Sequence, residues 1–269
     1  MKNRFLLIGI LSFVFFTFYS CKSDFEKLRA TANAETLHTK AFEYYEKGDY
    51  VKAQMLFELI INNLRGKVQA EKVYFYYANT HYYQEKFILA SYYYQNFSNT
   101  FPNSEYREEA DFMSAYSNYE LSPKYRLDQT YTDKAIDEFQ LFANYYPNSP
   151  RVEQCNMLID QMRQKLEKKA VAEAQLYYDL KRYQSAVHTL ENVVKDYPDT
   201  KEAERLKYLT IKSYYLLAQN SVYEKQAERY EITLKKSKAF IKRYPKSKHI
   251  KEVKTINENS NNKIKFILP

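Results

Sequence analysis

One four-residue phrase, an aromatic residue followed by Pro, a polar residue and then Ser or Thr, occurs four times in the chain. Its copies begin at positions 101, 146, 197 and 244, so they are 45, 51 and 47 residues apart. Pro ends a helix because it lacks the backbone donor, and a short polar side chain caps the helix that follows. Helix pairs that end at such a regular interval are typical of helical repeat proteins. The copies are Phe101-Pro102-Asn103-Ser104, Tyr146-Pro147-Asn148-Ser149, Tyr197-Pro198-Asp199-Thr200 and Tyr244-Pro245-Lys246-Ser247.

The composition also favours helices. The 269 residues include only three glycines, whereas strands joined by tight hairpins need glycine at positive φ. Aromatic residues make up 17% of the chain, with 29 Tyr and no Trp, and they provide enough apolar surface for a core. We therefore expect an all-α protein.

Between the recurring phrases, small and aromatic residues alternate in a fixed order. The first predicted pair has Ala41 and Tyr44, a turn at Gly48-Asp49, and then Ala53 and Phe57. This order resembles the tetratricopeptide repeat, in which small residues let paired helices approach and aromatic rings fill the space above them. The resemblance implies a tetratricopeptide-like helical solenoid of about five helix pairs. We expect these repeats at about 34–66, 71–104, 105–149, 151–200 and 201–247, followed by a C-terminal tail at 248–269.

Four segments depart from the regular repeat. The connection Leu121–Thr132 is about eight residues longer than the others, and Gln219–Arg229 also predicts a long connection. Arg151–Tyr178 contains no helix breaker, so the sequence predicts one unusually long helix there. Polar residues near the end of the chain predict a frayed tail.

The N-terminus has the pattern of a bacterial signal peptide. Lys2 and Arg4 precede the apolar run Phe5–Tyr19, whose fifteen residues would rise only about 22 Å as a helix. A membrane span needs about 30 Å, so a signal peptide at residues 1–20 fits better. The pair Ser20-Cys21 directly follows the apolar run.

The position of Cys21 resembles the lipobox of bacterial lipoproteins. This resemblance implies that the Cys21 thiol is diacylated and that the chain is cut before it. Residues 21–33 would then form a lipidated tether. The alternative is an ordinary secretory signal followed by a coincidental cysteine. After acylation only Cys155 would remain, so no internal disulfide could form, and Cys155 is expected to be a buried apolar residue.

The sequence contains no motif that points to catalysis. It has no nucleotide-binding loop, no Cys-x-x-Cys pair and no histidines at metal-ligand spacing. The net charge of +8 comes from scattered Lys and Arg rather than from a basic stripe, which argues against nucleic acid as a partner. We therefore expect a protein that is not an enzyme and that uses no cofactor and no metal.

The order of these features resembles the BamD-type family of outer-membrane β-barrel assembly lipoproteins. The resemblance implies that the protein is lipid-anchored on the periplasmic face of the outer membrane. It also implies that the protein binds the periplasmic domains of the barrel-forming subunit and receives unfolded outer-membrane proteins. The residues that carry the resemblance are Cys21, Ala41–Ala53, Ala110–Met113, Ser117–Leu121, Tyr146–Ser149, Val171–Glu173, Tyr177-Tyr178 and Asp196–Thr200.

Aromatic residues on the first helix of each early pair are candidates for a peptide-binding groove. Tetratricopeptide proteins present the positions between the packing residues to their concave groove, and rigid rings with polar tips suit an extended peptide. Tyr77, Tyr94 and His81 fall at packing positions and are expected in the core. The candidate groove residues are His38, Phe42, Tyr45, Phe75, Asn79, Tyr82, Phe112 and Tyr116.

Two other functions remain open at this point. The same fold could serve as a periplasmic scaffold lipoprotein of the cell-wall or division machinery. A lipoprotein that captures sugars at the cell surface is a further alternative, although such a protein would favour exposed Trp and a longer chain. For the assembly function, we expect repeats one to three to form the groove and repeats four and five to dock on the barrel-forming subunit.

Overall fold

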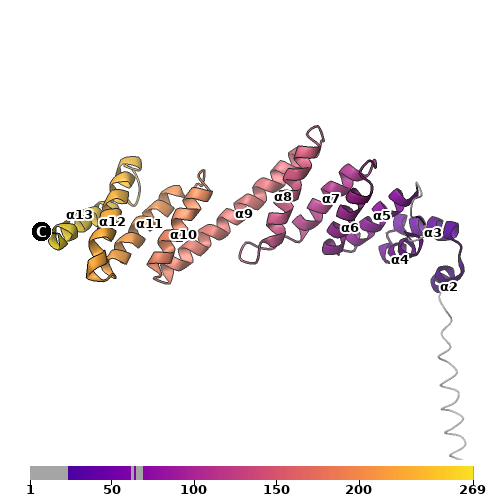
Figure 1. Ribbon diagram of the computed structural model, residues 1–269, viewed down its shortest axis with the longest axis horizontal. Coiled ribbons are helices and arrows are strands. Elements are labelled where there is room, and N and C mark those ends of the chain that lie inside the picture. Colours follow the sequence, from indigo (N-terminus) through magenta and orange to yellow (C-terminus); the bar gives the residue numbers. More distant parts are fainter. Residues whose placement is uncertain (1–23, 62–63, 65–68, 269) are drawn as a thin grey trace, which may run out of the picture. The chain divides into compact units, whose positions relative to one another are not determined.

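The computed structural model describes residues 24–61, 64 and 69–268, and these residues form helices without strands (Figure 1). The all-α expectation is therefore confirmed for the described part of the chain. The expected signal peptide and the expected lipid attachment at Cys21 lie outside the described residues. The helices are α2 (Asp24–Thr31), α3 (Ala34–Glu46), α4 (Tyr50–Ile61), α5 (Gln69–Tyr83), α6 (Phe87–Thr100), α7 (Arg107–Glu120), α8 (Thr130–Tyr145), α9 (Val152–Asp179), α10 (Tyr183–Asp196), α11 (Ala203–Gln219), α12 (Tyr223–Arg243) and α13 (Ile250–Ile267).

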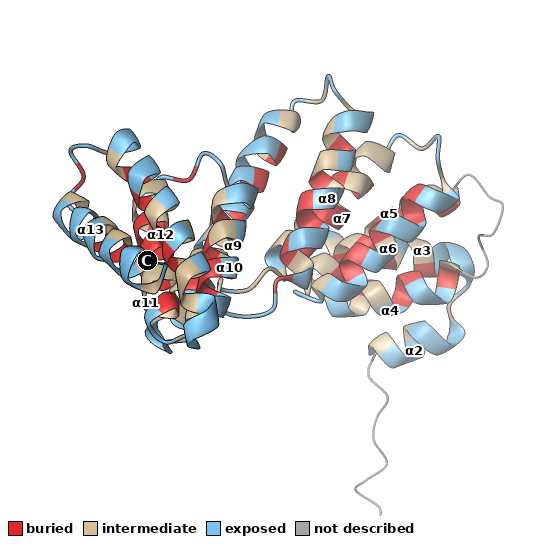
Figure 2. Ribbon diagram, turned by 60° about the vertical axis from the view of Figure 1, so that its left-hand side comes forward, coloured by how far each residue is buried: buried red, intermediate tan, exposed pale blue. Residues whose placement is uncertain are grey.

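The chain divides into two compact units. The first contains the described residues up to Ser122 together with Tyr131–Val152, and the second contains Pro123–Thr130 and the residues from Glu153 onward. Within each unit, successive helices pack on one another, as α3 does on α4 and α11 on α12. The buried residues lie on the sides of these helices that face their neighbours (Figure 2). Each unit therefore has a tetratricopeptide-like core between paired helices.

The small residues predicted at helix crossings are fully buried. Their side chains leave room for two helices to approach, so a ring from the next turn can cover the gap. Tyr77, Tyr94 and His81 are also buried, and the His81 ring stacks on Tyr93 at 4.7 Å. Cys155 is buried as well, which confirms its role as an apolar residue. The predicted alanines that are fully buried are Ala41, Ala53, Ala78, Ala90, Ala115, Ala135, Ala174 and Ala186.

The recurring phrase forms the same turn each time. Its aromatic residue closes a helix, as when the Phe101 N–H donates to the Phe97 carbonyl at 2.9 Å. The hydroxyl at the fourth position then accepts from the backbone N–H two residues later, at 3.0–3.2 Å. This hydroxyl stabilises the turn before the next helix. The expectation that it caps the helix itself is wrong, because the N-cap residues of α7, α11 and α13 lie two residues further on and their side chains make no capping hydrogen bond.

A second recurring turn lies inside the helix pairs and has a left-handed residue at its centre. Gly48 has φ = 76°, and Glu85 and Lys181 have φ = 58° and 57°. Each central N–H donates to a carbonyl three residues back, as Glu85 does to Tyr82 at 2.9 Å. Glycine adopts this backbone freely, whereas Glu and Lys are strained in it. The sequence identified only the turn at Gly48.

The structure confirms two of the predicted irregular segments. α7 ends at Glu120 and α8 begins at Thr130, so the long connection is present, and α9 is a single helix of 28 residues. The expectation of a long connection at Gln219–Arg229 is wrong, because α12 already begins at Tyr223. Polar side chains fix that helix start, since the Gln226 amide donates to the Ser221 carbonyl at 2.9 Å.

The expectation of a frayed tail is also wrong. α13 occupies most of residues 248–269 and packs on α11 and α12. Val253, Ile256 and Ser260 are spaced so that they share one face of this helix, and all three are buried. The spacing of these residues is visible in the sequence, but the many polar residues around them favoured the prediction of a frayed tail.

Candidate functional site

The eight groove candidates lie on three helices of the first unit, and each of these is the first helix of its pair. α3 carries His38, Phe42 and Tyr45. α5 carries the next three candidates, and α7 carries the last two. Rings and amides on successive first helices can therefore meet across the joints between pairs.

The joint between α3 and α5 is built from rings. The centroid of Phe42 lies 5.0 Å from that of Tyr76 and 4.9 Å from that of His38. Tyr45 meets the same Tyr76 ring at 4.8 Å. The Lys72 ammonium lies 4.9 Å from the centroid of Phe42, within cation–π range. Burial, followed by the charge of Lys72, lowers the pKa of His38.

Asn79 links this joint to the core through two hydrogen bonds. Its Nδ2 donates to the Tyr45 hydroxyl at 3.3 Å, and its Oδ1 accepts from the Tyr94 hydroxyl at 2.6 Å. Burial raises the pKa of Tyr94 well above its usual value, so this phenol stays neutral and can donate. Asn79 therefore fixes the position of two tyrosines from neighbouring helices.

The joint between α5 and α7 continues the row of rings. Tyr82 lies 6.3 Å from Tyr116, and Tyr116 stacks on Phe112 at 5.7 Å with an interplanar angle of 20°. The Arg151 guanidinium lies 4.1 Å from the Phe112 centroid. Burial raises the pKa of Tyr82 to about 12, so its hydroxyl is also neutral.

Three tyrosines that sequence reasoning missed complete the row. Tyr76 lies between Phe42 and Tyr45, and Tyr83 lies between Tyr45 at 6.1 Å and Tyr82 at 5.6 Å. Tyr50 stacks on Tyr83 at 4.6 Å. Tyr76 and Tyr83 are seven residues apart, which is two helical turns, so their shared face could have been identified from the sequence. We call the set the aromatic stripe: His38, Phe42, Tyr45, Tyr50, Tyr76, Asn79, Tyr82, Tyr83, Phe112 and Tyr116.

Two of the eight candidates have little exposed surface. Phe112 is 2% exposed and forms the base under Tyr116. Phe75 is 7% exposed and points into the core, where it stacks on Tyr106 at 4.9 Å. The neighbouring Tyr76 takes the position on the stripe, because consecutive helical residues point in different directions. The other six candidates are half-buried.

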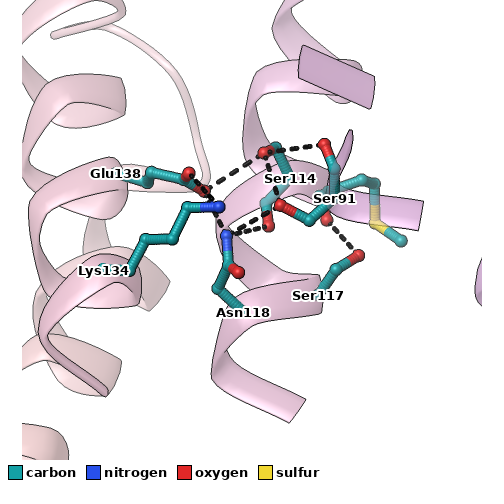
Figure 3. Close-up of polar contacts among 7 residues, drawn as sticks. Ser91, Ser114, Ser117, Asn118, Lys134 and Glu138 are labelled. Carbon is teal, nitrogen blue, oxygen red and sulfur yellow. Dashed lines mark hydrogen bonds and ion pairs between the residues drawn. The ribbon is translucent and has the colours of Figure 1, made fainter. Parts of the chain in front are cut away.

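A polar cluster lies behind the stripe, between α6, α7 and α8. Figure 3 shows the Glu138 carboxylate directed at Ser114 and Asn118. Its Oε2 accepts from the Asn118 amide at 2.8 Å and from the Ser114 hydroxyl at 3.1 Å, while Ser91 bonds to both of these residues. Burial raises the pKa of Glu138 despite these bonds. The cluster therefore holds a carboxylate whose charge is only partly compensated.

The second unit has charged groups at the corresponding joints. Tyr208 on α11 stacks on His249 at 3.9 Å, and its hydroxyl donates to Glu252 at 2.6 Å. The Lys212 ammonium lies 2.9 Å from the same carboxylate. A cavity of about 870 Å³ between α10, α11 and α12 is lined by cations that include Lys207 and Arg243. Apolar residues such as Ile211 and Phe240 lie beside these cations, so the surface is suited to a partner that carries acidic groups.

The described residues contain no group of His, Cys, Asp or Glu side chains that could hold a metal ion. None of the helices in the same part of the chain is both long enough and apolar enough to cross a bilayer.

Comparison with known proteins identifies a matching family. Residues 30–230 match the YfiO family, described as outer membrane lipoproteins. A protein of Aquifex aeolicus described as "Putative outer membrane protein assembly factor BamD" is 26% identical over 99% of this chain and 85% of its own length.

Two solved structures are also similar to the chain. The TPR domain of P58(IPK) has a TM-score of 0.41 and 15% identity, covering 87% of this chain and 66% of that one. A tetratricopeptide repeat protein from Parabacteroides merdae has a TM-score of 0.37 and 14% identity, covering 84% and 98%. The family match spans most of the chain, from the end of α2 into α12. The chain belongs to the YfiO family of outer membrane lipoproteins.

Proposed function

We propose that this chain is a non-enzymatic, lipid-anchored scaffold of the outer-membrane β-barrel assembly machinery, on the periplasmic face of the membrane. Membership of the YfiO family supports the outer-membrane assignment, and the name of the Aquifex aeolicus relative supports the assembly role. The lipid anchor at Cys21 rests on the lipobox pattern, since Cys21 precedes the residues that match the family.

The aromatic stripe is the observation that carries the proposal for substrate binding. It runs without a gap through three successive first helices of the first unit, with Tyr50 added from α4, and neighbouring ring centroids are 4.6–6.3 Å apart. An extended segment of an unfolded outer-membrane protein presents alternate side chains to one surface. Half-buried tyrosines offer such a segment apolar contact and a hydroxyl, at a small cost in conformational entropy.

The second unit is proposed to dock on the periplasmic domains of the barrel-forming subunit. The cavity lined by Lys207, Lys236 and Arg243 supports this assignment, because cations around a concave surface favour an acidic partner. Its carboxylate, Glu191, is already paired with Lys236 at 2.5 Å. The two partners would therefore be bound by different chemistry on different units.

A matched pair of tyrosines tests the stripe. Tyr83 is 51% exposed and lies on the stripe, whereas Tyr92 is 54% exposed on α6 and is not part of it. Tyr83→Ala should weaken binding of a C-terminal barrel-strand peptide by about tenfold, which is the loss expected for one aromatic contact. Tyr92→Ala should leave the affinity unchanged. Equal affinities for the two variants in fluorescence anisotropy would exclude the stripe as the peptide site.

Charge reversal tests the docking surface. Lys207→Glu combined with Arg243→Glu should abolish co-purification of the barrel-forming subunit and leave peptide binding intact. Tyr83→Ala should give the opposite result. If each variant loses both partners while circular dichroism shows a folded chain, the division between the units is wrong. Capture of cell-wall or division proteins in place of the barrel-forming subunit would favour the alternative scaffold function.

The lipid anchor has its own test. Cys21→Ala should either keep the signal peptide or be released in soluble form, because no acyl chains can attach. Mass spectrometry of the wild-type protein should find Cys21 at the mature N-terminus with its lipid. An unmodified N-terminus at another residue would show that the anchor is assigned wrongly.

A further inference from the structure

A second cavity in the second unit lies between the connection 123–130 and α9. Its volume is about 810 Å³. Its lining includes four cationic side chains, Lys124 and Arg126 from the connection and Lys165 and Lys168 from α9. No carboxylate is among the described residues that line it. The cavity therefore concentrates positive charge over a small concave surface.

Tyr125 forms an aromatic wall of this cavity. The Lys168 ammonium lies 4.7 Å from its ring centroid, and the Arg126 guanidinium carbon lies 5.5 Å from it. Arg126 Nε also donates to the Tyr125 hydroxyl at 3.0 Å. These contacts orient two cations around one ring and leave the remaining guanidinium donors for a ligand.

The connection is held in this shape by its own polar residues. Gln129 is 5% exposed, and its amide donates to the Lys124 and Leu127 carbonyls at 3.1 and 3.0 Å. Lys169 on α9 donates to the same Leu127 carbonyl at 2.7 Å. The nearby Asp128 carboxylate accepts from the Thr130 N–H at 3.0 Å, and hydrogen bonds from the side chain and the backbone of Thr130 lower its pKa. Lys124 and Arg126 are therefore presented by a fixed loop, and Lys165 and Lys168 by a helix.

The size and lining of the cavity indicate the class of ligand. Sites of 300–1,000 Å³ hold small molecules or headgroups, whereas a stable protein partner usually covers about 800 Å² of surface on each side. Arg and Lys together favour phosphate oxygens, and Arg can bind two of them at once. The aliphatic stems of the lysines, with Tyr125 and Leu127, add apolar surface beside the charges. Burial lowers the pKa of Lys165, as expected where part of its stem is covered.

We propose that this cavity binds the phosphate-bearing headgroup of an anionic lipid. The family to which the chain belongs consists of outer membrane lipoproteins, so the protein works beside a phospholipid surface. Basic pockets and clusters of Lys and Arg are a known way for proteins to hold such headgroups. This second contact with lipid would be independent of the N-terminal anchor and of both protein partners in the proposed function.

The test uses the full mature lipoprotein in a neutral detergent, titrated with phosphatidylglycerol and observed by native mass spectrometry. Arg126→Gln combined with Lys168→Gln removes two charges from the cavity and should raise the apparent Kd by about 30-fold. Lys251→Gln combined with Lys254→Gln removes two exposed charges from α13 in the same unit and should leave the Kd unchanged. Melting curves confirm folding, and Lys124→Gln is a milder variant if the double change unfolds the loop.

Several results would overturn the assignment. Equal losses in the cavity variant and in the α13 variant would mean a general attraction of charge. Equally tight binding of glycerol 3-phosphate would assign the cavity to a free phosphate compound, and equally tight binding of a polyglutamate peptide would assign it to a protein. Peptide binding at the aromatic stripe, measured on the same samples, would be unaffected by any of these results, so failure here is separable from failure of the proposed function.

Discussion

The two units build the same joint from different chemistry. In the first unit, successive first helices meet through rings, as where Tyr82 on α5 meets Tyr116 on α7. In the second unit, the joint between α11 and α13 has one ring stack, Tyr208 on His249, and adds the Tyr208–Glu252 hydrogen bond and the Lys212–Glu252 ion pair. Both units place fully buried small residues at their helix crossings. The repeat geometry is therefore set by these small residues, which leaves the chemistry of the joint free to vary.

This difference predicts different responses to solution conditions. Ring contacts act over short range and depend little on salt or pH, whereas exposed ion pairs are screened by salt. The two units also differ in the direction in which the pKa of one carboxylate in each is shifted. Burial raises the pKa of Glu138 in the first unit. Burial also acts to raise the pKa of Glu252, but hydrogen bonds from Tyr208 and Lys212 outweigh it and hold that pKa below its usual value.

The largest expected effect tests whether rings carry the stability of the first unit. Tyr94 is fully buried and donates to Asn79, so Tyr94→Ala should cost about 3–5 kcal/mol of unfolding free energy. Tyr94→Phe removes only the hydroxyl and should cost about 1 kcal/mol. Tyr92→Ala, at an exposed position of the same helix, is the control. Urea unfolding curves in which Tyr94→Ala matches this control would refute a ring-based core.

The second prediction tests whether small residues set the geometry in both units. Ala90→Leu in the first unit and Ala186→Leu in the second should each cost about 1–3 kcal/mol, because both sites are fully buried at helix crossings. Thermal unfolding followed by circular dichroism measures the loss. A melting temperature unchanged in either variant would mean that the small residue there does not determine the crossing.

The third prediction concerns these two carboxylates, whose pKa values are shifted in opposite directions. Glu138 has a raised pKa, so its ionisation lowers the stability of the fold as pH rises above about 4.5. The stability of Glu138→Gln relative to the wild type should therefore increase as pH rises. Glu252 has a lowered pKa, so it stabilises the fold above about 4.5 and loses that contribution as pH falls. Glu252→Gln should therefore be less stable than the wild type at neutral pH and equal to it in acid. Stability differences of the same sign for both variants across pH 3–8 would contradict the contrast.

The smallest expected effect concerns the left-handed turns, which occur in both units. Gly48→Ala should cost about 1 kcal/mol, since a Cβ there meets no neighbouring atom within 4 Å and only the backbone is strained. Glu85→Gly in the first unit and Lys181→Gly in the second relieve the same strain and should each gain up to about 1 kcal/mol. Differential scanning calorimetry resolves these shifts. A loss of stability in either glycine variant would mean that the Glu85 or Lys181 side chain contributes more than its backbone strain costs.

The sequence by itself determined the helical repeat, its Pro-containing turns and its small residues. Pro102 and Ser104 act on the backbone next to them, and Ala90 fits a crossing because of its own size, so each can be identified without knowing its neighbours. The long α9 follows from the absence of any breaker between two recognisable turns. These features are local, and local chemistry can be identified from a single chain.

Only the tertiary structure decided which rings face outward and which polar segments become helical. Phe75 and Tyr76 are adjacent and equally suited to a groove, and the choice between them depends on Tyr106 and Phe42 from other helices. α13 forms because α11 and α12 cover Val253 and Ile256, although its sequence is mostly polar. Glu85 and Lys181 take a left-handed backbone because the helices on either side fix the turn. Such outcomes depend on contacts between distant residues, whose free energy outweighs local preference.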